Sequence, residues 1–448
     1  MKTRIRLLIT GLMLLHASVY AQQGAKTAFS LEEAINYALE YNQNVINASY
    51  EKDIAETQVK ETLSSGLPQI TGEVTLNHNF EPQKQLLDAS TFDPTVPEGN
   101  EVPITFQRRY DGNMALNVRQ LIFDGSFFVG LQAARTFREL SSKDHIKTQI
   151  DVVEAVSKAY YNVLVTKEQY DLLEVNFSRL DTLLRETKAR FETGFVEKID
   201  VSRIQVEYNN TKVRLTNTRE LLKVSYDLLK FQMGMPIKTT ITLTDVLEEV
   251  LFDEEDNETF NYNERIEYSR LQTNLALTNL DIKNNRVQYL PNLYANLNLG
   301  YNTQADQANQ WFEGNRWLDF GFVGATLSVP IFDGFLKKSK IQRNKIQLKQ
   351  LDQSFAQLEN SIDLEIIQSK TNLKNALDNM AAQKENTDLA EEIYNITRIK
   401  YQEGVGANLE VIEADADYKE AQTNYYNSLY DALVAKIDLD KAYGRLLK

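Results

Sequence analysis

Ile122-Phe123-Asp124-Gly125 and Ile331-Phe332-Asp333-Gly334 are two copies of one tetrapeptide, and residues 125 and 334 stand 209 positions apart. Each copy leads into a long stretch with almost no helix breaker. Two further pairs of glycines keep a spacing of 210 residues: Gly194 with Gly404, and Gly234 with Gly444. Matched landmarks at nearly one spacing predict that the chain is built from two structural repeats.

The stretches 131–193 and 335–403 contain neither glycine nor proline. Apolar residues recur in them at spacings of three and four, which is the periodicity of helices packed along a seam. We therefore predict two helices of roughly 60 to 70 residues, about 100 Å long at about 1.5 Å per residue. A helical pattern resumes directly after Gly194 and Gly404, so each glycine is predicted to reverse the chain between two antiparallel helices.

Four stretches between the predicted helices alternate apolar and polar residues, as strands do. In 292–302, apolar residues occupy the odd positions and asparagine occupies most of the even ones. The fourth stretch, 317–330, is irregular because Phe320 and Phe322 fall on the polar phase. We predict a bulge there.

Residues 1–21 have the layout of a secretory signal peptide, with cations at positions 2, 4 and 6 and a short apolar run from 7 to 15. That run is too short to span a bilayer. The chain has no cysteine, which excludes a lipid-modified N-terminal cysteine, disulfides and thiolate metal sites. Its formal net charge of −14 argues against nucleic acid as a partner.

Export and strand length together favour a membrane interpretation of the strands. Each strand has about the length that crosses an outer membrane, and four aromatic residues near the strand ends are candidates for the membrane interface: Phe80, Tyr110, Tyr301 and Trp317. Four strands cannot close a barrel, and an open edge in lipid leaves N–H and C=O groups unpaired. The interpretation therefore requires further copies of the chain, and three copies would supply twelve strands. A half-buried soluble sheet gives the same alternation, so an exported soluble coiled-coil scaffold or adhesin is the alternative.

The expected organisation is a signal peptide at 1–21 followed by two repeats, each running helix, strand, strand, long helix, turn, helix. In the first repeat, 22–258, we expect strands at about 67–80 and 107–123, a long helix at about 126–193, a turn at 194–198, a helix at about 199–232 and a linker at 235–258. In the second repeat, 259–448, we expect strands at about 290–302 and 317–330, a long helix at about 335–403, a turn at 404–407 and a helix at about 408–446.

The order of these elements and the motifs at their junctions resemble the outer membrane efflux protein (TolC) family of Gram-negative bacteria along essentially all of the mature chain. The most specific marks are the segments Leu121–Gly125, Pro330–Gly334, Tyr401–Gly404 and Gly234–Pro236. The resemblance implies a mostly α-helical chain whose homotrimer forms a twelve-stranded transmembrane β-barrel, continued by a long α-helical coiled-coil barrel. It also implies an integral protein of the outer membrane, in contact with its lipid, that extends into the periplasm.

Function and partners follow from the same resemblance. The family's members are exit ducts that dock to a periplasmic adaptor (membrane fusion) protein and an inner-membrane pump, and they conduct substrates passively. The resemblance implies no enzymatic activity and no cofactor, and it leaves the substrate open among drugs, metal cations and proteins.

Two sites carry over from the family residue by residue. The helix-turn-helix tips match the periplasmic tips at which adaptors dock: Gly194, Phe195, Val196, Gly404, Val405 and Gly406. The acids of the periplasmic gate match Asp200 and Glu410, with Glu413 one turn later, and Tyr401 matches a tyrosine that ties neighbouring helices together. We expect Asp200 to pair with Tyr401 of a neighbouring helix and so to hold the tips together. Some members have an arginine where this chain has Gly406, which weakens the expectation of a salt-bridged lock.

A simpler interpretation exists for each acidic feature. Asp200, Glu410 and Glu413 can be solvated acids in the first turn of a helix, where the helix dipole favours negative charge. The run Asp253–Asp256 lacks the alternating ligand spacing of a calcium loop and is predicted to be a solvated linker. The chain has three histidines, and no nucleophile motif, phosphate loop or ligand cluster accompanies them.

Overall fold

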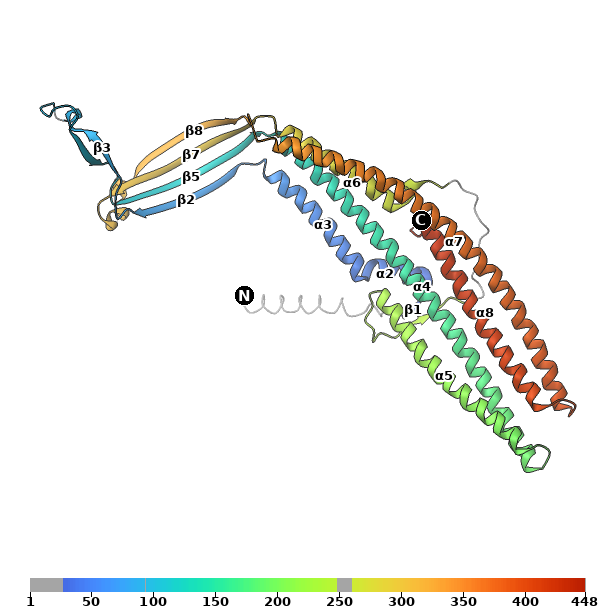
Figure 1. Ribbon diagram of the computed structural model, residues 1–448. Helices are drawn as coiled ribbons and strands as arrows, with labels where there is room; N and C mark the ends of the chain where they lie inside the picture. Colours follow the sequence, from blue (N-terminus) through green and yellow to red (C-terminus); the bar gives the residue numbers. More distant parts are fainter. Residues whose placement is uncertain (1–26, 93, 248–259, 448) are drawn as a thin grey trace, which may run out of the picture. The chain divides into compact units, whose positions relative to one another are not determined.

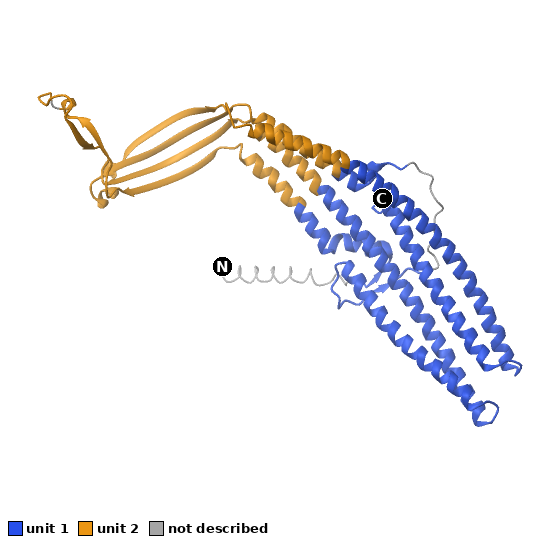
Figure 2. Ribbon diagram, in the orientation of Figure 1, with its two compact units in different colours: residues 1–51, 142–270, 354–448 blue, residues 52–141, 271–353 orange. Residues whose placement is uncertain are grey.

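The computed structural model describes residues 27–92, 94–247 and 260–447 (Figure 1). The predicted signal peptide and the acidic run at 253–256 lie outside these ranges. The chain divides into two compact units, one formed by residues 1–51, 142–270 and 354–448 and the other by residues 52–141 and 271–353 (Figure 2). Each unit takes segments from both halves of the sequence.

The second unit contains a four-stranded antiparallel sheet with the order β2-β5-β7-β8. Its strands are β2 (Gln69–His78), β5 (Tyr110–Phe123), β7 (Asn292–Ala305) and β8 (Leu318–Ser328). The segment between β2 and β5 contains a small hairpin of β3 (Lys84–Asp88) and β4 (Glu101–Thr105). Within the sheet, β2 and β8 each have one edge without a partner strand.

The register gives the sheet one apolar face and one largely polar face. Apolar residues align across the strands in rows, such as Val74, Met114 and Tyr301, or Ile70, Val118, Leu297 and Val323. On the other face, Asn296 donates to Thr326 at 2.9 Å, and Asn298 donates to Asn117. Much of the apolar face is exposed in the single chain; Val323 is 80% exposed.

The bulge predicted for the fourth strand is wrong. The pairing of β7 with β8 is continuous from Asn292/Ser328 to Asn302/Leu318. Phe320 and Phe322 instead lie in register opposite Gly300 and Asn298, on the largely polar face. The ring of Phe320 occupies the space beside Gly300, where a Cβ would lie 2.9 Å from its ring carbon Cζ. The aromatic side chain is thus accommodated by a cross-strand glycine. The one register shift of the sheet is in β5, between Leu121 and Phe123.

Seven helices account for most of the described chain: α2 (Leu31–Tyr41), α3 (Gln43–Ser64), α4 (Gly125–Glu192), α5 (Lys198–Gln232), α6 (Ile266–Val287), α7 (Leu336–Gln402) and α8 (Asn408–Ala442). Ser30 and Glu33 form a capping box at the start of α2. Helices α2 and α3 are separated only by Asn42, whose backbone is extended. Among the described residues, no helix combines the length and the apolarity needed to span a bilayer.

The largest core lies in the first unit, where α2 and the middle of α4 meet the ends of α5 and α8. The fully buried Tyr160 donates its hydroxyl to the carbonyl of Phe29 at 3.0 Å. Beside it, β1 (Ala28–Phe29) pairs in parallel with β6 (Thr242–Leu243). Residues 235–247, expected as linker, are therefore part of this core, with Met235, Ile241 and Leu247 buried.

The repeated tetrapeptide lies at the start of both long helices, but its glycine has a different structural role in each copy. Asp124 caps α4, because its carboxylate accepts from the Ser126 backbone at 2.7 Å. Gly125 is required by close packing, since a Cβ there would lie 2.9 Å from Val287. In the second copy, the Asp333 carboxylate accepts from the Lys337 backbone, and Gly334 has a φ of 64° with open space around it.

The third pair of repeated glycines joins helices end to end. Gly234 follows α5 with a φ of 74°, and a Cβ on it would lie 2.4 Å from the carbonyl oxygen of Tyr41. Gly444 follows α8 with a φ of 72°, and a Cβ on it would lie 2.7 Å from the carbonyl oxygen of Glu264. Each junction also receives a side-chain donor: Asn42 donates to the carbonyl of Gln232 at 2.7 Å, and Arg265 donates to that of Ala442 at 2.8 Å.

Candidate functional site

The tip between α4 and α5 is a tight reversal built on Gly194. Its φ of 79° is left-handed, and the Phe195 backbone donates to the carbonyl of Arg190 at 2.9 Å while Gly194 donates to that of Phe191 at 3.0 Å. This is the hydrogen-bond pattern that closes a helix with glycine just beyond its end. Sequence and structure therefore agree on the reason for this glycine.

The tip between α7 and α8 repeats the arrangement around Gly404. Its φ is 76°, and Val405 donates to the carbonyl of Lys400 at 3.0 Å. Gly406 makes a further bond to the same carbonyl, and a Cβ on Gly406 would lie 3.1 Å from the Lys400 Cβ and the Tyr401 backbone nitrogen. The chain has little space for a side chain at 406, because this residue packs against the last turn of α7.

Both tips expose apolar side chains at their ends. Phe195 is 84% exposed and Val405 is 79% exposed, and Ile199 and Leu409 behind them are also exposed. Val196 is half-buried. Such side chains clustered at the end of a hairpin are suited to contact with another protein.

Asp200 links the two hairpins within one chain. Its carboxylate accepts from the Glu197 backbone at 3.2 Å as part of the cap of α5. The side-chain amide of Asn408, at the start of α8, donates to the other carboxylate oxygen at 3.4 Å. Asp200 is therefore a helix-cap residue that also contacts the opposite tip.

The expected pairing of Asp200 with Tyr401 is not formed within the chain. The Tyr401 hydroxyl is buried and has no hydrogen-bond partner among the described residues. The guanidinium of Arg190 lies over the Tyr401 ring, 5.7 Å from its centroid. Asp200 is already occupied by the cap and by Asn408, which explains why it does not reach across to α7.

Glu410 and Glu413 lie on one face of the first turns of α8 and are exposed. Neither forms an ion pair with another described residue of the chain. The residues between and beside them, Asn408, Val411 and Ala414, are buried on the opposite face. The helix therefore directs both carboxylates away from its own hairpin partner.

A cavity of about 290 Å³ lies above the tips, between α4, α5, α7 and α8. Arginines and tyrosines line much of it, and Arg179 lies over Tyr394 at 5.3 Å and over Tyr418 at 6.0 Å. Burial raises the pKa of the Tyr418 phenol. These cation–π contacts join α4 to the other hairpin.

A buried lysine forms a second link between the hairpins. Lys419 of α8 is 7% exposed and pairs with Asp415 in its own helix and with Glu207 of α5 at 3.6 Å. A buried charge is tolerated only when it is paired, so α5 and α8 are held in one alignment here.

The outer membrane efflux protein family model matches residues 34–234 and 267–445, which together make up most of the chain. The chain belongs to this family. The family places this efflux protein in the outer membrane, and the family consists of efflux proteins rather than enzymes. The alternative of a soluble scaffold or adhesin is set aside.

Individual relatives are distant but cover nearly the whole efflux protein. It is 20% identical to outer membrane protein TolC of Vibrio cholerae over 96% of this chain and 94% of that one. It is 21% identical to the proteases secretion protein PrtF of Dickeya chrysanthemi, over 94% and 90% of the two chains. Its fold matches the open state of the Neisseria gonorrhoeae MtrE outer membrane channel with a TM-score of 0.72 at 16% identity, covering 93% and 89%.

Several residues at the tips of this efflux protein carry no signal in the sequence. Asn408, Arg179 and Lys419 look like ordinary polar positions of a coiled coil, yet each joins the two hairpins. Such roles depend on which helices become neighbours across more than 200 residues. The glycines, in contrast, were identifiable because their spacing is repeated.

Proposed function

We propose that this protein is the outer membrane exit duct of a tripartite efflux or secretion system. It passively conducts substrates that an inner-membrane pump delivers through a periplasmic adaptor protein, and it catalyses no reaction. The single observation that carries the proposal is the sheet, which has an exposed apolar face, a polar opposite face and two unpaired edges.

The unpaired edges support a homotrimer. Strands of 10 to 14 residues are long enough to cross an outer membrane, where exposed N–H and C=O groups cannot remain without partners. Antiparallel pairing of β2 of one protomer with β8 of the next satisfies both edges and continues the alternation of the sheet. Three copies then close a twelve-stranded barrel whose outward face is apolar.

The long helices support a periplasmic tunnel. Helices α4 and α7 have 68 and 67 residues. At about 1.5 Å per residue each is roughly 100 Å long. Two such helices per copy, each paired with shorter helices, form the wall of an α-helical barrel that continues the β-barrel across the periplasm. The two repeats, 22–258 and 259–448, contribute equivalent helix pairs to this wall. Residues 1–21 are removed as a signal peptide.

The tips are proposed to dock the adaptor. Gly194, Phe195 and Val196 on one hairpin, and Gly404, Val405 and Gly406 on the other, supply reversals whose exposed ends are apolar. A helical hairpin of an adaptor can bury Phe195 and Val405 without disturbing the barrel. The substrate stays open, since relatives serve both efflux and protease secretion by name.

Glu410 and Glu413 are proposed to form the periplasmic gate, with Asp200 and Tyr401 holding the neighbouring helices. In a trimer each exposed acid becomes a ring of three carboxylates, which raises the local concentration of cations in a narrow pore. The pore is then cation-selective and blocked by multivalent cations from the periplasmic side.

Three measurements test the proposal. Folded protein purified in detergent should have the mass of a trimer, and the membrane-bound protein should resist extraction by carbonate and urea. In planar bilayers, Glu410→Gln with Glu413→Gln should abolish cation selectivity and block by a trivalent cation, whereas Glu420→Gln, an exposed acid ten residues further along α8, should not. A folded monomer or dimer would contradict the duct, and unchanged selectivity in the double variant would reduce the two acids to solvated helix-start residues.

A further inference from the structure

The start of α7 carries a basic segment that the duct does not explain. Between Lys337 and Lys349 the chain has six cations and no acid: Lys337, Lys338, Lys340, Arg343, Lys345 and Lys349. The chain as a whole has a net charge of −14. A basic cluster in an acidic protein marks a surface that meets negative charge.

The matching part of the first repeat shows that the fold does not need these cations. At the spacing of 209 set by the repeated tetrapeptide, Lys338, Lys345 and Lys349 correspond to Val129, Thr136 and Leu140. Helix α4 nevertheless starts at the same tetrapeptide as α7, and an aspartate of that tetrapeptide accepts a backbone hydrogen bond from the first turn in both. The lysines are therefore an addition to α7 alone.

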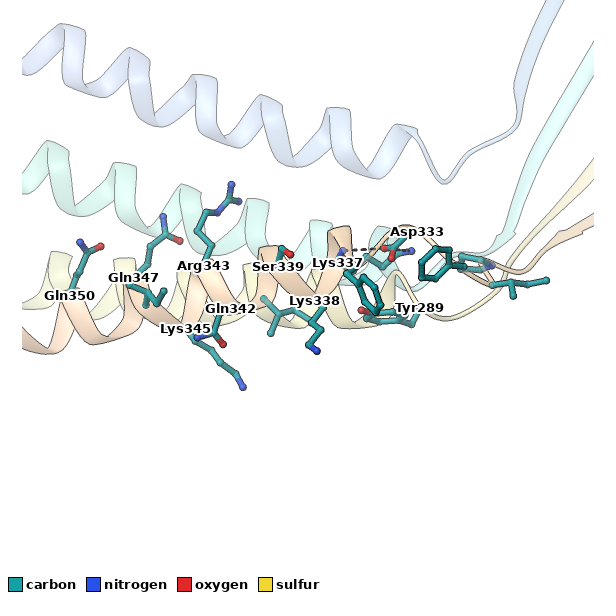
Figure 3. A pocket seen from close by; sticks show the side chains of 16 residues that line it. Tyr289, Asp333, Lys337, Lys338, Ser339, Gln342, Arg343, Lys345, Gln347 and Gln350 are labelled. Atoms are coloured by element: carbon teal, nitrogen blue, oxygen red, sulfur yellow. Dashed lines mark hydrogen bonds and ion pairs between the residues drawn. The ribbon is translucent and has the colours of Figure 1, made fainter.

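Three of the cations form one stripe. Lys338, Lys345 and Lys349 are separated by seven and four residues, which places them on the same side of the helix. All three are exposed and form no ion pair with another described residue. In Figure 3, Lys338 and Lys345 project to the same side, away from the neighbouring ribbons, while Arg343 projects to the opposite side. Lys337 differs, because it pairs with Asp333 at 3.1 Å and lies over the Tyr289 ring.

Apolar side chains lie directly beside this stripe. Ile331 is 94% exposed and Phe332 is 75% exposed, and both line the same open hollow as Lys338 and Lys345, about 1250 Å³ in volume (Figure 3). Phe335, with a left-handed φ of 65°, packs edge-on against Phe332 and lies under the Lys338 ammonium. The odd-numbered apolar row of β8 ends at Leu327, and Val329 and Ile331 extend it beyond the strand.

We propose that this surface, Ile331, Phe332, Phe335 and the Lys338–Lys345–Lys349 stripe, binds anionic phospholipids of the periplasmic leaflet of the outer membrane. The proposal rests on the placement of β8 in that membrane under the proposed function. The apolar side chains then enter the acyl boundary, while the lysines extend along it to reach the phosphates. From Lys338 to Lys345 the helix rises about 10 Å, comparable to the Debye length at physiological salt, so both ammonium groups act within the field of one headgroup layer.

The test uses the full-length trimer in nanodiscs of phosphatidylethanolamine with a minor fraction of phosphatidylglycerol. Native mass spectrometry counts the phosphatidylglycerol that stays bound when the disc is removed. The test variant is Lys338→Gln with Lys345→Gln and Lys349→Gln. The control is Lys340→Gln with Arg343→Gln and Lys374→Gln, which removes the same charge from exposed or half-exposed positions of the same helix outside the stripe.

The wild type and the control should retain phosphatidylglycerol in preference to phosphatidylethanolamine, and the test variant should lose this preference, by roughly fivefold in affinity for each lysine removed at low salt. The triple Lys→Arg variant should keep it, because charge is conserved. Equal loss in test and control variants would overturn the proposal, since it would reflect net charge alone.

Two other outcomes would assign the surface differently. A test variant that no longer forms trimers, while the Arg variant does, would make the stripe a contact between protomers. A changed ion selectivity with unchanged lipid retention would place the lysines in the lumen. Both results leave the duct intact, whereas failure of the wild type to form a trimer or a channel would overturn the proposed function itself.

Discussion

Replacing Gly234 with alanine should damage the protein far more than the same change at Gly194, although both glycines have nearly the same backbone conformation. Their φ angles are 74° and 79°. Alanine in this left-handed region costs roughly 1 to 2 kcal/mol at either position. At Gly194 nothing lies within 4 Å of the added Cβ, so this is the whole cost.

Gly234 adds a collision with the backbone. The new Cβ would lie 2.4 Å from the Tyr41 carbonyl oxygen and 2.6 Å from the Asn42 Cα. Neither atom belongs to a flexible side chain, so the end of α5 must move away from the junction of α2 and α3. Overpacking of this kind adds about 1 to 3 kcal/mol, which brings the total to roughly 2 to 5 kcal/mol.

The assay is thermal unfolding of detergent-solubilised protein, followed by circular dichroism at several scan rates because unfolding of a protein of this kind is commonly irreversible. The wild type should be the most stable, followed by Gly194→Ala, and Gly444→Ala and Gly234→Ala should be the least stable. Gly444→Ala belongs with Gly234→Ala because its new Cβ would lie 2.7 Å from the Glu264 carbonyl oxygen. Equal destabilisation at Gly194 and Gly234 would refute the reasoning that the helix junction, and not φ, sets the cost.

Three further outcomes can be measured. Gly194→Val or Gly404→Val should leave trimers intact but abolish both efflux and cross-linking to the adaptor, because a β-branched residue strains only the exposed reversal. Normal cross-linking in both variants would contradict the docking assignment. Asp124→Ala should lower stability by about 1 kcal/mol through loss of the α4 cap, measured by the same thermal assay, with Asp124→Asn largely restoring it. Burial alone would raise the pKa of Glu154, but hydrogen bonds from Lys158 and Lys441 hold that pKa below its usual value. The ionised Glu154 should therefore stabilise the folded protein at pH values above the ordinary carboxyl range, and this stabilisation should disappear as the pH falls through the lowered pKa. Glu154→Gln should flatten this part of the acid-stability profile, and an unchanged profile would exclude the contribution.

The features that the sequence predicted best are those with local causes. The long helices were predictable because breakers are absent over more than 60 residues, and the reversals were predictable because Gly194 and Gly404 meet a local steric need. The sheet was predictable because alternation with period two is fixed by strand geometry. The function followed from the repeat and the junction motifs, and the family match agrees with it.

The features that the sequence could not predict depend on distant partners. Nothing in the local sequence at Asn42 forces a break, but the end of α5 packs closely on this point, and Asn42 donates to the carbonyl of Gln232. The two-residue strands β1 and β6 exist only because their partners are more than 200 residues away. Phe320 looks irregular in the sequence because its partner, Gly300, lies on another strand.

The two repeats preserve backbone geometry more strictly than side-chain chemistry. The helix junctions keep a left-handed glycine, yet the donor that completes each one is Asn42 in the first repeat and Arg265 in the second. A junction needs only a donor directed at the last carbonyls of the preceding helix, which an amide and a guanidinium both provide. Surfaces such as the lysine stripe of α7 can therefore differ between the two halves, because neither helix junction depends on them. Differences between positions that correspond in the two halves of the sequence are for this reason the best guide to what each helix pair contacts.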